Sequence, residues 1–119
     1  IWHYQRQRLT IAARANKLDA VDGPFADFRS PETYREEARR AMTLGMVGKW
    51  AIHPSQVALA QEVFSPIADD VARARDMMRA YDEALAQGLG AVQYEGKMID
   101  IASVRIVRNL VQRADLIGM

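Results

Sequence analysis

Cysteine is absent from the 119-residue sequence, which excludes disulfide bonds and thiolate chemistry within this chain. A surplus of either charge is also missing, because 16 Lys and Arg residues nearly balance 15 Asp and Glu residues. This balance gives no support to nucleic acid or an anionic membrane as a partner. No apolar run approaches the ~20 residues that span a bilayer, and no signal peptide is visible. These absences favour a cytoplasmic globular protein.

An initiating methionine is missing too. The chain begins with Ile1, and residues 1–17 have the pattern of a helix with no good capping residue before Trp2. A helix without a visible beginning indicates that the sequence starts inside a larger fold. We therefore expect this chain to be the C-terminal portion of a longer protein.

Histidine is scarce, and its two occurrences, His3 and His53, are far apart in the sequence. Neither has a second histidine or a pair of carboxylates at the spacing of a metal site. We assign no metal ligand to this chain and reject a zinc site built from it alone.

Helical and strand patterns alternate in the first half of the chain. Two short apolar runs, residues 18–25 and 46–52, are predicted as buried strands because turn residues end each of them. Helices of ten or more residues follow both runs, which is typical of parallel βαβ units. Two strands cannot form a parallel sheet with both faces covered, so more strands are expected upstream. The predicted fold class is α/β, with residues 1–64 as the last two strands and helices of a (β/α)₈ barrel.

Residues 65–119 have a different pattern, which predicts a long helix, a hairpin and a last helix. The long helix has an apolar stripe from Ile67 to Leu85, with alternating spacings of four and three. The hairpin covers residues 93–100 and turns at Glu95 and Gly96. Because glycines flank it, we interpret this region as a mobile helical and hairpin lid that extends the barrel.

The loops after the two predicted strands hold the candidate binding residues, since barrel enzymes place their chemistry there. Asp22 is either a turn residue that accepts backbone hydrogen bonds or a carboxylate at the catalytic mouth. Ile52 and His53 end the second strand, and Pro54 restricts His53 to extended conformations. This restriction would hold the backbone of the strand end open for a ligand, although a lone histidine before proline is usually structural.

Lys49 and Asp100 each permit two interpretations. Lys49, inside the second strand, can form a Schiff base or an ion pair with an acid that precedes it in the chain. Asp100 can cap the last helix, which would lower its pKa, or act as a proton-transfer group at the tip of the lid. A lid that opens and closes can separate these two roles of Asp100 in time.

Four separated segments, "VDGPFADF", "TLGMVGKWAIHPSQ", "VFSP" and "YEGKMIDIAS", resemble the malyl-CoA lyases, within the wider family of citrate lyase β-subunits and related aldolases. "DGPFADF" and "GMVGKWAIHP" are more similar to malyl-CoA/β-methylmalyl-CoA lyases than to citrate lyase β-subunits. The resemblance implies a Mg²⁺-dependent barrel that cleaves L-malyl-CoA or β-methylmalyl-CoA to acetyl-CoA or propionyl-CoA and glyoxylate. It also implies that the Mg²⁺ ligands lie upstream of this chain.

The resemblance carries over to particular residues. Ile52 and His53 match the acyl-CoA contact after the last barrel strand, and Asp22 lies in the matching "DG" loop. Asp100 matches a lid aspartate that acts as acid or base at the thioester α-carbon. The family resemblance further implies a homo-oligomer, a trimer or a hexamer, in which the lid covers a neighbouring subunit's site.

Three alternatives stay open. The first is a citrate lyase β-like enzyme that cleaves citryl or citramalyl thioesters. The second is a fragment that acts only as a non-catalytic oligomerisation module, because the long helix and the last helix both have apolar faces. The third is an aldolase that uses Lys49 as a Schiff base.

Overall fold

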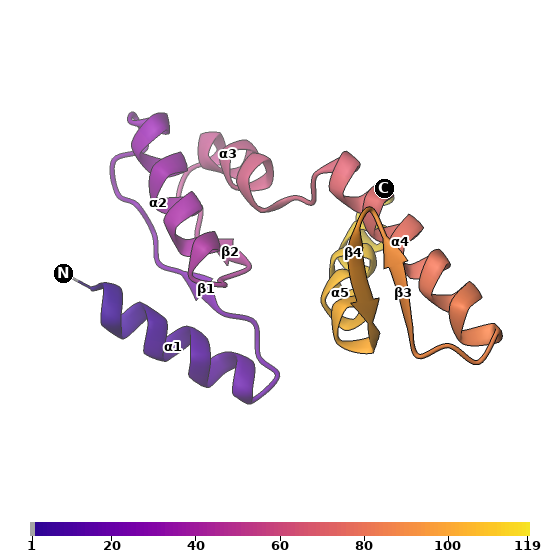
Figure 1. The fold of residues 1–119 in the computed structure, drawn as a ribbon. Coiled ribbons are helices and arrows are strands. Elements are labelled where there is room, and N and C mark those ends of the chain that lie inside the picture. The colour runs from indigo at the N-terminus through magenta and orange to yellow at the C-terminus, as the bar shows by residue number, and fades with distance from the viewer. Residues whose placement is uncertain (1) are drawn as a thin grey trace. The chain divides into compact units, whose positions relative to one another are not determined.

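The structure, a computed structural model, describes residues 2–119, which divide into two compact units between Ser65 and Pro66 (Figure 1). The first unit contains α1 (His3–Ala15), β1 (Val21–Asp22), α2 (Pro31–Thr43), β2 (Gly48–Lys49) and α3 (Pro54–Phe64). The second contains α4 (Ala68–Ala86), β3 (Ala91–Tyr94), β4 (Lys97–Asp100) and α5 (Ile101–Leu116). The prediction of an α/β protein is therefore confirmed.

The first unit is built around a parallel pair of very short strands. Val21 lies opposite Gly48 and Asp22 opposite Lys49, and α2 connects the two strands. A parallel pair needs such a helical crossover, so this part is a βαβ unit, as predicted. Each strand spans only two residues, fewer than the apolar runs suggested, because each has only the other as a pairing partner among residues 2–119.

The core of the first unit lies between α2 and α3, which pack side by side (Figure 1). Tyr34, Ala38 and Val63 form one buried cluster, and Phe64 packs against it. On α3 the apolar Val57 is 48% exposed, whereas the neighbouring Gln56 is 1% exposed. A polar side chain thus occupies a core position at the start of α3.

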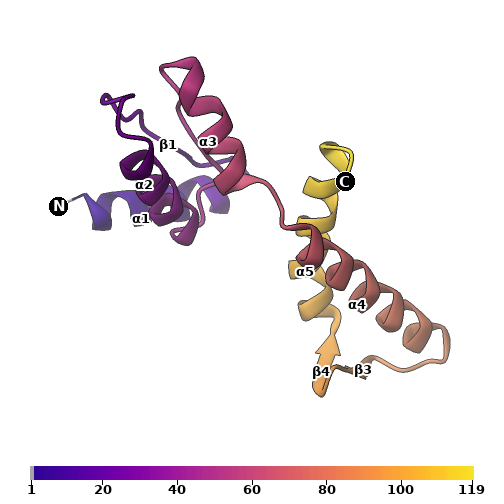
Figure 2. The same cartoon turned by 90° about the horizontal axis from the view of Figure 1, so that it is seen from above.

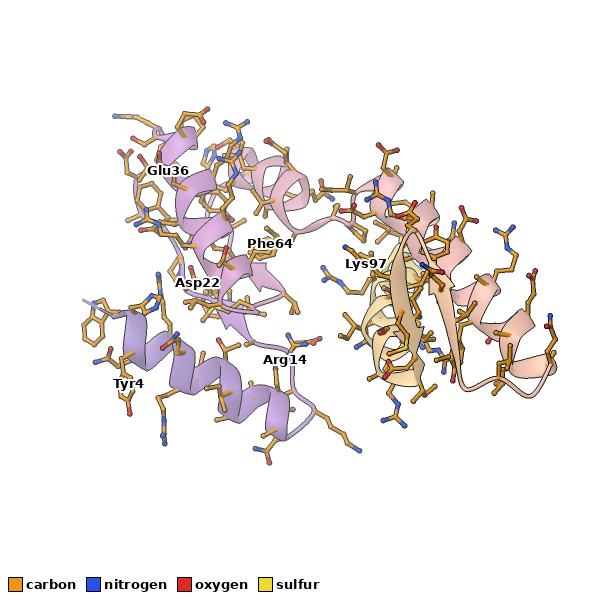
Figure 3. All side chains as sticks on the ribbon, in the orientation of Figure 1. Tyr4, Arg14, Asp22, Glu36, Phe64 and Lys97 are labelled. Carbon is orange, nitrogen blue, oxygen red and sulfur yellow. The ribbon has the colours of Figure 1, made fainter. Side chains whose placement is uncertain are left out.

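The ends of α2 show how sequence signals set its length. Pro31 is the first helical residue, a position that suits its fixed φ, and the hydroxyl of Ser30 donates to Asp27 Oδ2 at 2.6 Å and does not cap the helix. At the other end, Gly45 has a φ of +92°, which a residue with a side chain rarely adopts. Its carbonyl accepts a 2.9 Å hydrogen bond from Arg14 of α1, labelled in Figure 3.

The second unit is two helices joined by an antiparallel hairpin. In Figure 2 the hairpin connects the end of α4 to the start of α5. Val92 pairs with Ile99, and Ala91 pairs with Asp100. The predicted hairpin and its turn at residues 95 and 96 are confirmed. Among residues 2–119, none of the helices has the length and apolar character needed to cross a membrane.

Tyr81, Ile99 and Val104 form the core of the second unit. The buried face of α4 is shorter than the predicted stripe, because Ile67 and Leu85 are 65% and 54% exposed. Helix α4 begins at Ala68, two residues after Pro66, and no side chain caps it. Packing against α5 and the hairpin, rather than the full apolar pattern, decides which turns of α4 are buried.

The hairpin turn carries backbone strain at its first residue. Glu95 and Gly96 have φ values of +47° and +76°, as a two-residue type I′ turn requires. Asparagine tolerates this left-handed region better than glutamate, which has a longer side chain and no local hydrogen bond to offer. Glu95 is therefore the hairpin residue that suits its backbone conformation least.

Substitutions at Glu95 and Gly96 test the assignment of this turn. We expect Glu95→Asn to raise the free energy of unfolding by ~0.5 kcal/mol and Gly96→Ala to lower it by ~1 kcal/mol. Open space surrounds Gly96, so the alanine effect would come from the backbone alone. Urea denaturation measures both changes. A loss of stability in Glu95→Asn would contradict the turn geometry.

Candidate functional site

A buried charged cluster lies where β1 and β2 end. The side chain of Lys49 is 0% exposed and that of Asp22 is 3% exposed. Lys49 Nζ lies 2.8 Å from Asp22 Oδ2, 3.0 Å from Glu37 Oε2 and 2.8 Å from the carbonyl oxygen of Gly23. An ammonium group has three N–H donors, so its donors and the surrounding oxygens match in number. Asp22 is labelled in Figure 3.

Asp22 has a second cation beside it. Arg6 Nη2, on α1, lies 3.1 Å from Asp22 Oδ1, and Thr10, one helical turn later on α1, is buried. The turn role considered for Asp22 is therefore wrong, because its carboxylate pairs with Lys49 and Arg6 instead of the turn backbone. Asp22 joins α1 to the strand pair.

Lys49 takes the ion-pair role rather than the Schiff-base role. Its nitrogen has oxygens of Asp22, Glu37 and Gly23 around it within 3.0 Å. A substrate carbonyl carbon would have to displace one of these partners to reach the amine. The hydrogen bond to Gly23 also fixes the start of the loop that follows β1.

Tyr34 supports the backbone just after β2. Its hydroxyl lies 3.3 Å from the carbonyl oxygen of Trp50 and 3.5 Å from that of Lys49, and its ring is 1% exposed. Burial, and then the negative charge of Asp22, raise the pKa of the Tyr34 phenol. The phenol therefore keeps its proton and remains a donor to this backbone.

Ile52 and His53 lie in the loop between β2 and α3. The side chain of Ile52 is 54% exposed, and its N–H donates to Gln56 Oε1 at 2.9 Å. His53 is extended, with φ −139° and ψ 143°, as the following Pro54 predicted. His53 Nδ1 accepts the N–H of Ser55 at 3.2 Å, so this histidine caps α3.

Asp100, in the second unit, caps α5. Its Oδ1 accepts the backbone N–H of Ser103 at 2.9 Å and the hydroxyl of Ser103 at 3.1 Å. The predicted capping role is confirmed. The backbone hydrogen bond and then the side-chain hydrogen bond of Ser103 lower the pKa of Asp100 below its ordinary value. Asp100 is therefore an exposed, ionised carboxylate at neutral pH.

No group of three or more His, Asp or Glu residues in the described chain, residues 2–119, is placed to hold a metal ion. The two carboxylates that do come together, Asp22 and Glu37, both lie against the Lys49 ammonium. These residues do not fit a Mg²⁺ site by themselves.

Three residues of the first unit were missed by the sequence reasoning. Glu37 follows Tyr34 by three positions and precedes the buried Ala38, so its place on the packed face of α2 was readable from spacing. Gln56 lies in the "HPSQ" segment, but its burial has no signal in the sequence. Arg6 lies one helical turn before Thr10, on a helix whose apolar stripe gave no clear inner face.

Comparison with known proteins gives consistent results. A family model described as a C–C bond lyase of the TIM-barrel fold matches residues 3–119. L-malyl-CoA/β-methylmalyl-CoA lyase of Cereibacter sphaeroides is 48% identical over 117 residues, which cover 98% of this chain and 37% of that protein. The mitochondrial citramalyl-CoA lyase of Rattus norvegicus is 34% identical over 111 residues, which cover 93% of this chain and 33% of that protein. The chain thus spans about a third of the length of these relatives.

Solved structures show the same fold. A citrate lyase from Burkholderia xenovorans LB400 superposes with a TM-score of 0.78 at 22% identity, over 95% of this chain and 35% of that one. Protein CitE from Mycobacterium tuberculosis, in complex with magnesium, acetoacetate and coenzyme A, superposes with a TM-score of 0.74. It is 29% identical, over 92% of this chain and 40% of that one.

The buried charged cluster predicts a large effect of removing its cation. We expect Lys49→Met to lower the free energy of unfolding by about 3 kcal/mol, because Asp22 and Glu37 would lose a buried partner. Lys97→Met is the matched control, since Lys97 is exposed and should change stability by less than about 0.5 kcal/mol. Urea denaturation measures both. Equal effects of the two substitutions would show that the cluster contributes little.

Ser103 controls the pKa of Asp100. We expect Ser103→Ala to raise this pKa, because the hydroxyl bond is lost while the backbone bond stays. Wild-type Asp100 stabilises the fold fully above its unfolded pKa of about 3.9, and this contribution is lost as pH falls through the lower folded pKa. A ¹³C carboxyl titration measures the shift. Ser55→Ala, which removes a partner of His53, should leave the pKa of Asp100 unchanged.

Proposed function

Because this chain belongs to the C–C bond lyase family of the TIM-barrel fold, we propose that it is part of an enzyme that reversibly cleaves a malyl-CoA thioester. L-malyl-CoA would give acetyl-CoA and glyoxylate, and β-methylmalyl-CoA would give propionyl-CoA and glyoxylate. The observation that carries this proposal is the 48% identity to L-malyl-CoA/β-methylmalyl-CoA lyase over 98% of the chain. The 34% identity to citramalyl-CoA lyase makes the citramalyl thioester the second candidate substrate.

The architecture we propose follows from the two units. Residues 2–65 would supply the last two strands and helices of the barrel, and the parallel β1 and β2 support this assignment. Residues 66–119 would form a lid, since the hairpin is flanked by Gly88, at φ +79°, and is built around the positive-φ turn at Gly96. Few buried side chains anchor this hairpin, which suits a segment that moves over a site.

We place the acyl-CoA contact at the loop that begins with Ile52 and His53. The exposed Ile52 side chain offers an apolar surface for the acyl-pantetheine arm, and the loop backbone is held by the bond from Ile52 N–H to Gln56. Asp22 contributes indirectly in this proposal. Its carboxylate holds the Lys49 ammonium, which in turn holds the Gly23 carbonyl of the neighbouring loop.

Asp100 is proposed as the proton-transfer group. In the direction of bond formation, its ionised carboxylate would take a proton from the α-carbon of acetyl-CoA. The enolate carbon would then bond to the aldehyde carbon of glyoxylate, whose oxygen would take the proton back from the Asp100 carboxylic acid to become the hydroxyl group. In cleavage the steps reverse, so Asp100 would take the hydroxyl proton as the carbon–carbon bond breaks and then give that proton to the α-carbon. Closure of the lid would exclude water, which would otherwise quench the enolate.

Mg²⁺ is the proposed cofactor of the whole enzyme, supported by the magnesium bound in the CitE complex. Its ligands are expected outside this chain, because the described residues do not fit a metal site. When bound, the cation would stabilise negative charge that develops on oxygen. We expect this chain alone to be inactive, since it spans only 37% of its malyl-CoA lyase relative.

A homo-oligomer, a trimer or a hexamer, is the proposed assembly, with the lid placed over a neighbouring subunit's site. Support comes from large apolar side chains that the second unit leaves exposed, since a subunit contact would cover them. Met98, Ile106 and Leu116 are 80%, 75% and 86% exposed. The cytoplasm remains the proposed location, on the lack of cysteine in the sequence.

Substitution of Asp100 separates its two roles. Asparagine caps helices as well as aspartate does, so Asp100→Asn should preserve α5 while lowering kcat by about 10²–10⁴-fold. Asp100→Ala should lose both the cap and the catalysis. Assays of the whole enzyme with Mg²⁺, together with thermal unfolding, measure these effects. If Asp100→Asn keeps kcat near wild type while Asp100→Ala lowers Tm, the residue is only a cap.

The same assay distinguishes the candidate substrates. Glyoxylate, pyruvate and oxaloacetate are offered in turn with acetyl-CoA, and the condensation rate is measured for each. Preference for glyoxylate supports the malyl-CoA lyase proposal. Preference for pyruvate or oxaloacetate would move the assignment to a citramalyl or citryl thioester, and no reaction with any of them would leave the oligomerisation role.

A further inference from the structure

Gln56 is a buried polar residue that uses both ends of its amide. It is 1% exposed near the start of α3. Its Oε1 accepts the N–H of Ile52 at 2.9 Å, and its Nε2 donates to the carbonyl oxygen of Phe25 at 2.9 Å. Ile52 belongs to the loop after β2, whereas Phe25 belongs to the loop after β1. One side chain therefore joins the backbones of both loops.

Two further contacts join the same pair of loops. The ring of His53 stacks on the ring of Phe28, with centroids 4.4 Å apart and an interplanar angle of 14°. Lys49 Nζ donates to the carbonyl oxygen of Gly23 at 2.8 Å. The loop after β1 is thus linked to the segment around β2 at its start, its middle and its end.

Of these contacts, the Gln56 bonds hold the backbone most directly. The stack between Phe28 and His53 is solvent-accessible, because both residues are exposed. The amide of Gln56 is buried, and loss of its side chain would leave a backbone donor and a backbone acceptor without partners. Ile52 N–H, the donor that Gln56 accepts from, lies at the proposed acyl-CoA contact.

We infer that Gln56 is a positioning residue for the acyl-CoA, which it serves by holding the loops after β1 and β2 in one fixed arrangement. This inference rests on the proposed function, since it concerns the same loop. Gln56 acts through Ile52 and Phe25 and touches no reacting atom. Gln56 should stabilise bound acyl-CoA equally in the ground state and in the transition state. Loss of its side chain should therefore raise KM more than it lowers kcat.

The test uses the whole enzyme with Gln56→Met, which nearly conserves side-chain volume and removes both amide bonds. We expect the KM for the acyl-CoA and the Kd for CoA, measured by calorimetry, to rise about tenfold. The kcat and the KM for glyoxylate should stay within about twofold of wild type. Amide hydrogen exchange at Ile52 should become faster, since its acceptor is lost.

Gln61→Met is the matched control, because Gln61 lies on the same helix and is exposed. It should leave all five measurements unchanged. If Gln56→Met does not fold, Phe28→Leu replaces it, since this exposed residue joins the same loops through the His53 stack. Phe28→Leu should also raise the KM for the acyl-CoA without lowering kcat.

A folded Gln56→Met enzyme with wild-type affinity for CoA would overturn the inference, and so would a fall in kcat at constant KM. In either case an active wild-type enzyme would still support the proposed function. A wild-type enzyme that neither binds CoA nor condenses acetyl-CoA with glyoxylate would instead overturn the proposed function, and the inference with it.

Discussion

The first unit depends on the contacts that the buried Lys49 ammonium makes. Burying a charge costs free energy unless partners replace its water, and here oxygens of Asp22, Glu37 and Gly23 replace it. These partners come from β1, α2 and the loop after β1, so a single nitrogen fixes elements that are otherwise held by small apolar clusters. The short strand pair is aligned by this charge as well as by its backbone bonds. The loops proposed to contact acyl-CoA begin at the ends of these two strands.

Much of the fold was predictable from local sequence, because local sequence causes it. Pro31 and Gly45 bound α2, Pro54 extends His53, and the turn at residues 95 and 96 makes a hairpin. The errors lie where tertiary packing decides. Strand lengths depend on partners that local sequence does not show, and burial of Ile67, Leu85 and Val57 depends on which neighbours reach them.

The candidate site was also predictable only in part. A resemblance in sequence pointed to Ile52, His53 and Asp100, and the cap at Asp100 also followed from its place before a helix. The partners of Asp22 were not predictable, because Arg6 and Lys49 reach it across 16 and 27 positions of sequence. Buried pairs of this kind obey no spacing rule. The lowered pKa of Asp100 has a consequence for its proposed role, since the bonds from Ser103 that stabilise the ionised carboxylate would also weaken it as a proton acceptor.

The pairing of the hairpin limits how this segment can change in length. Side chains alternate along β4, so that Ile99 is 2% exposed while Met98 and Asp100 face outward. Adding or deleting one residue between the turn and α5 would reverse this alternation, burying a carboxylate and exposing an isoleucine. Only changes of two residues at a time preserve both the core and the outward carboxylate. The constraint on this segment is therefore that insertions and deletions contain an even number of residues, and it does not fix the length itself.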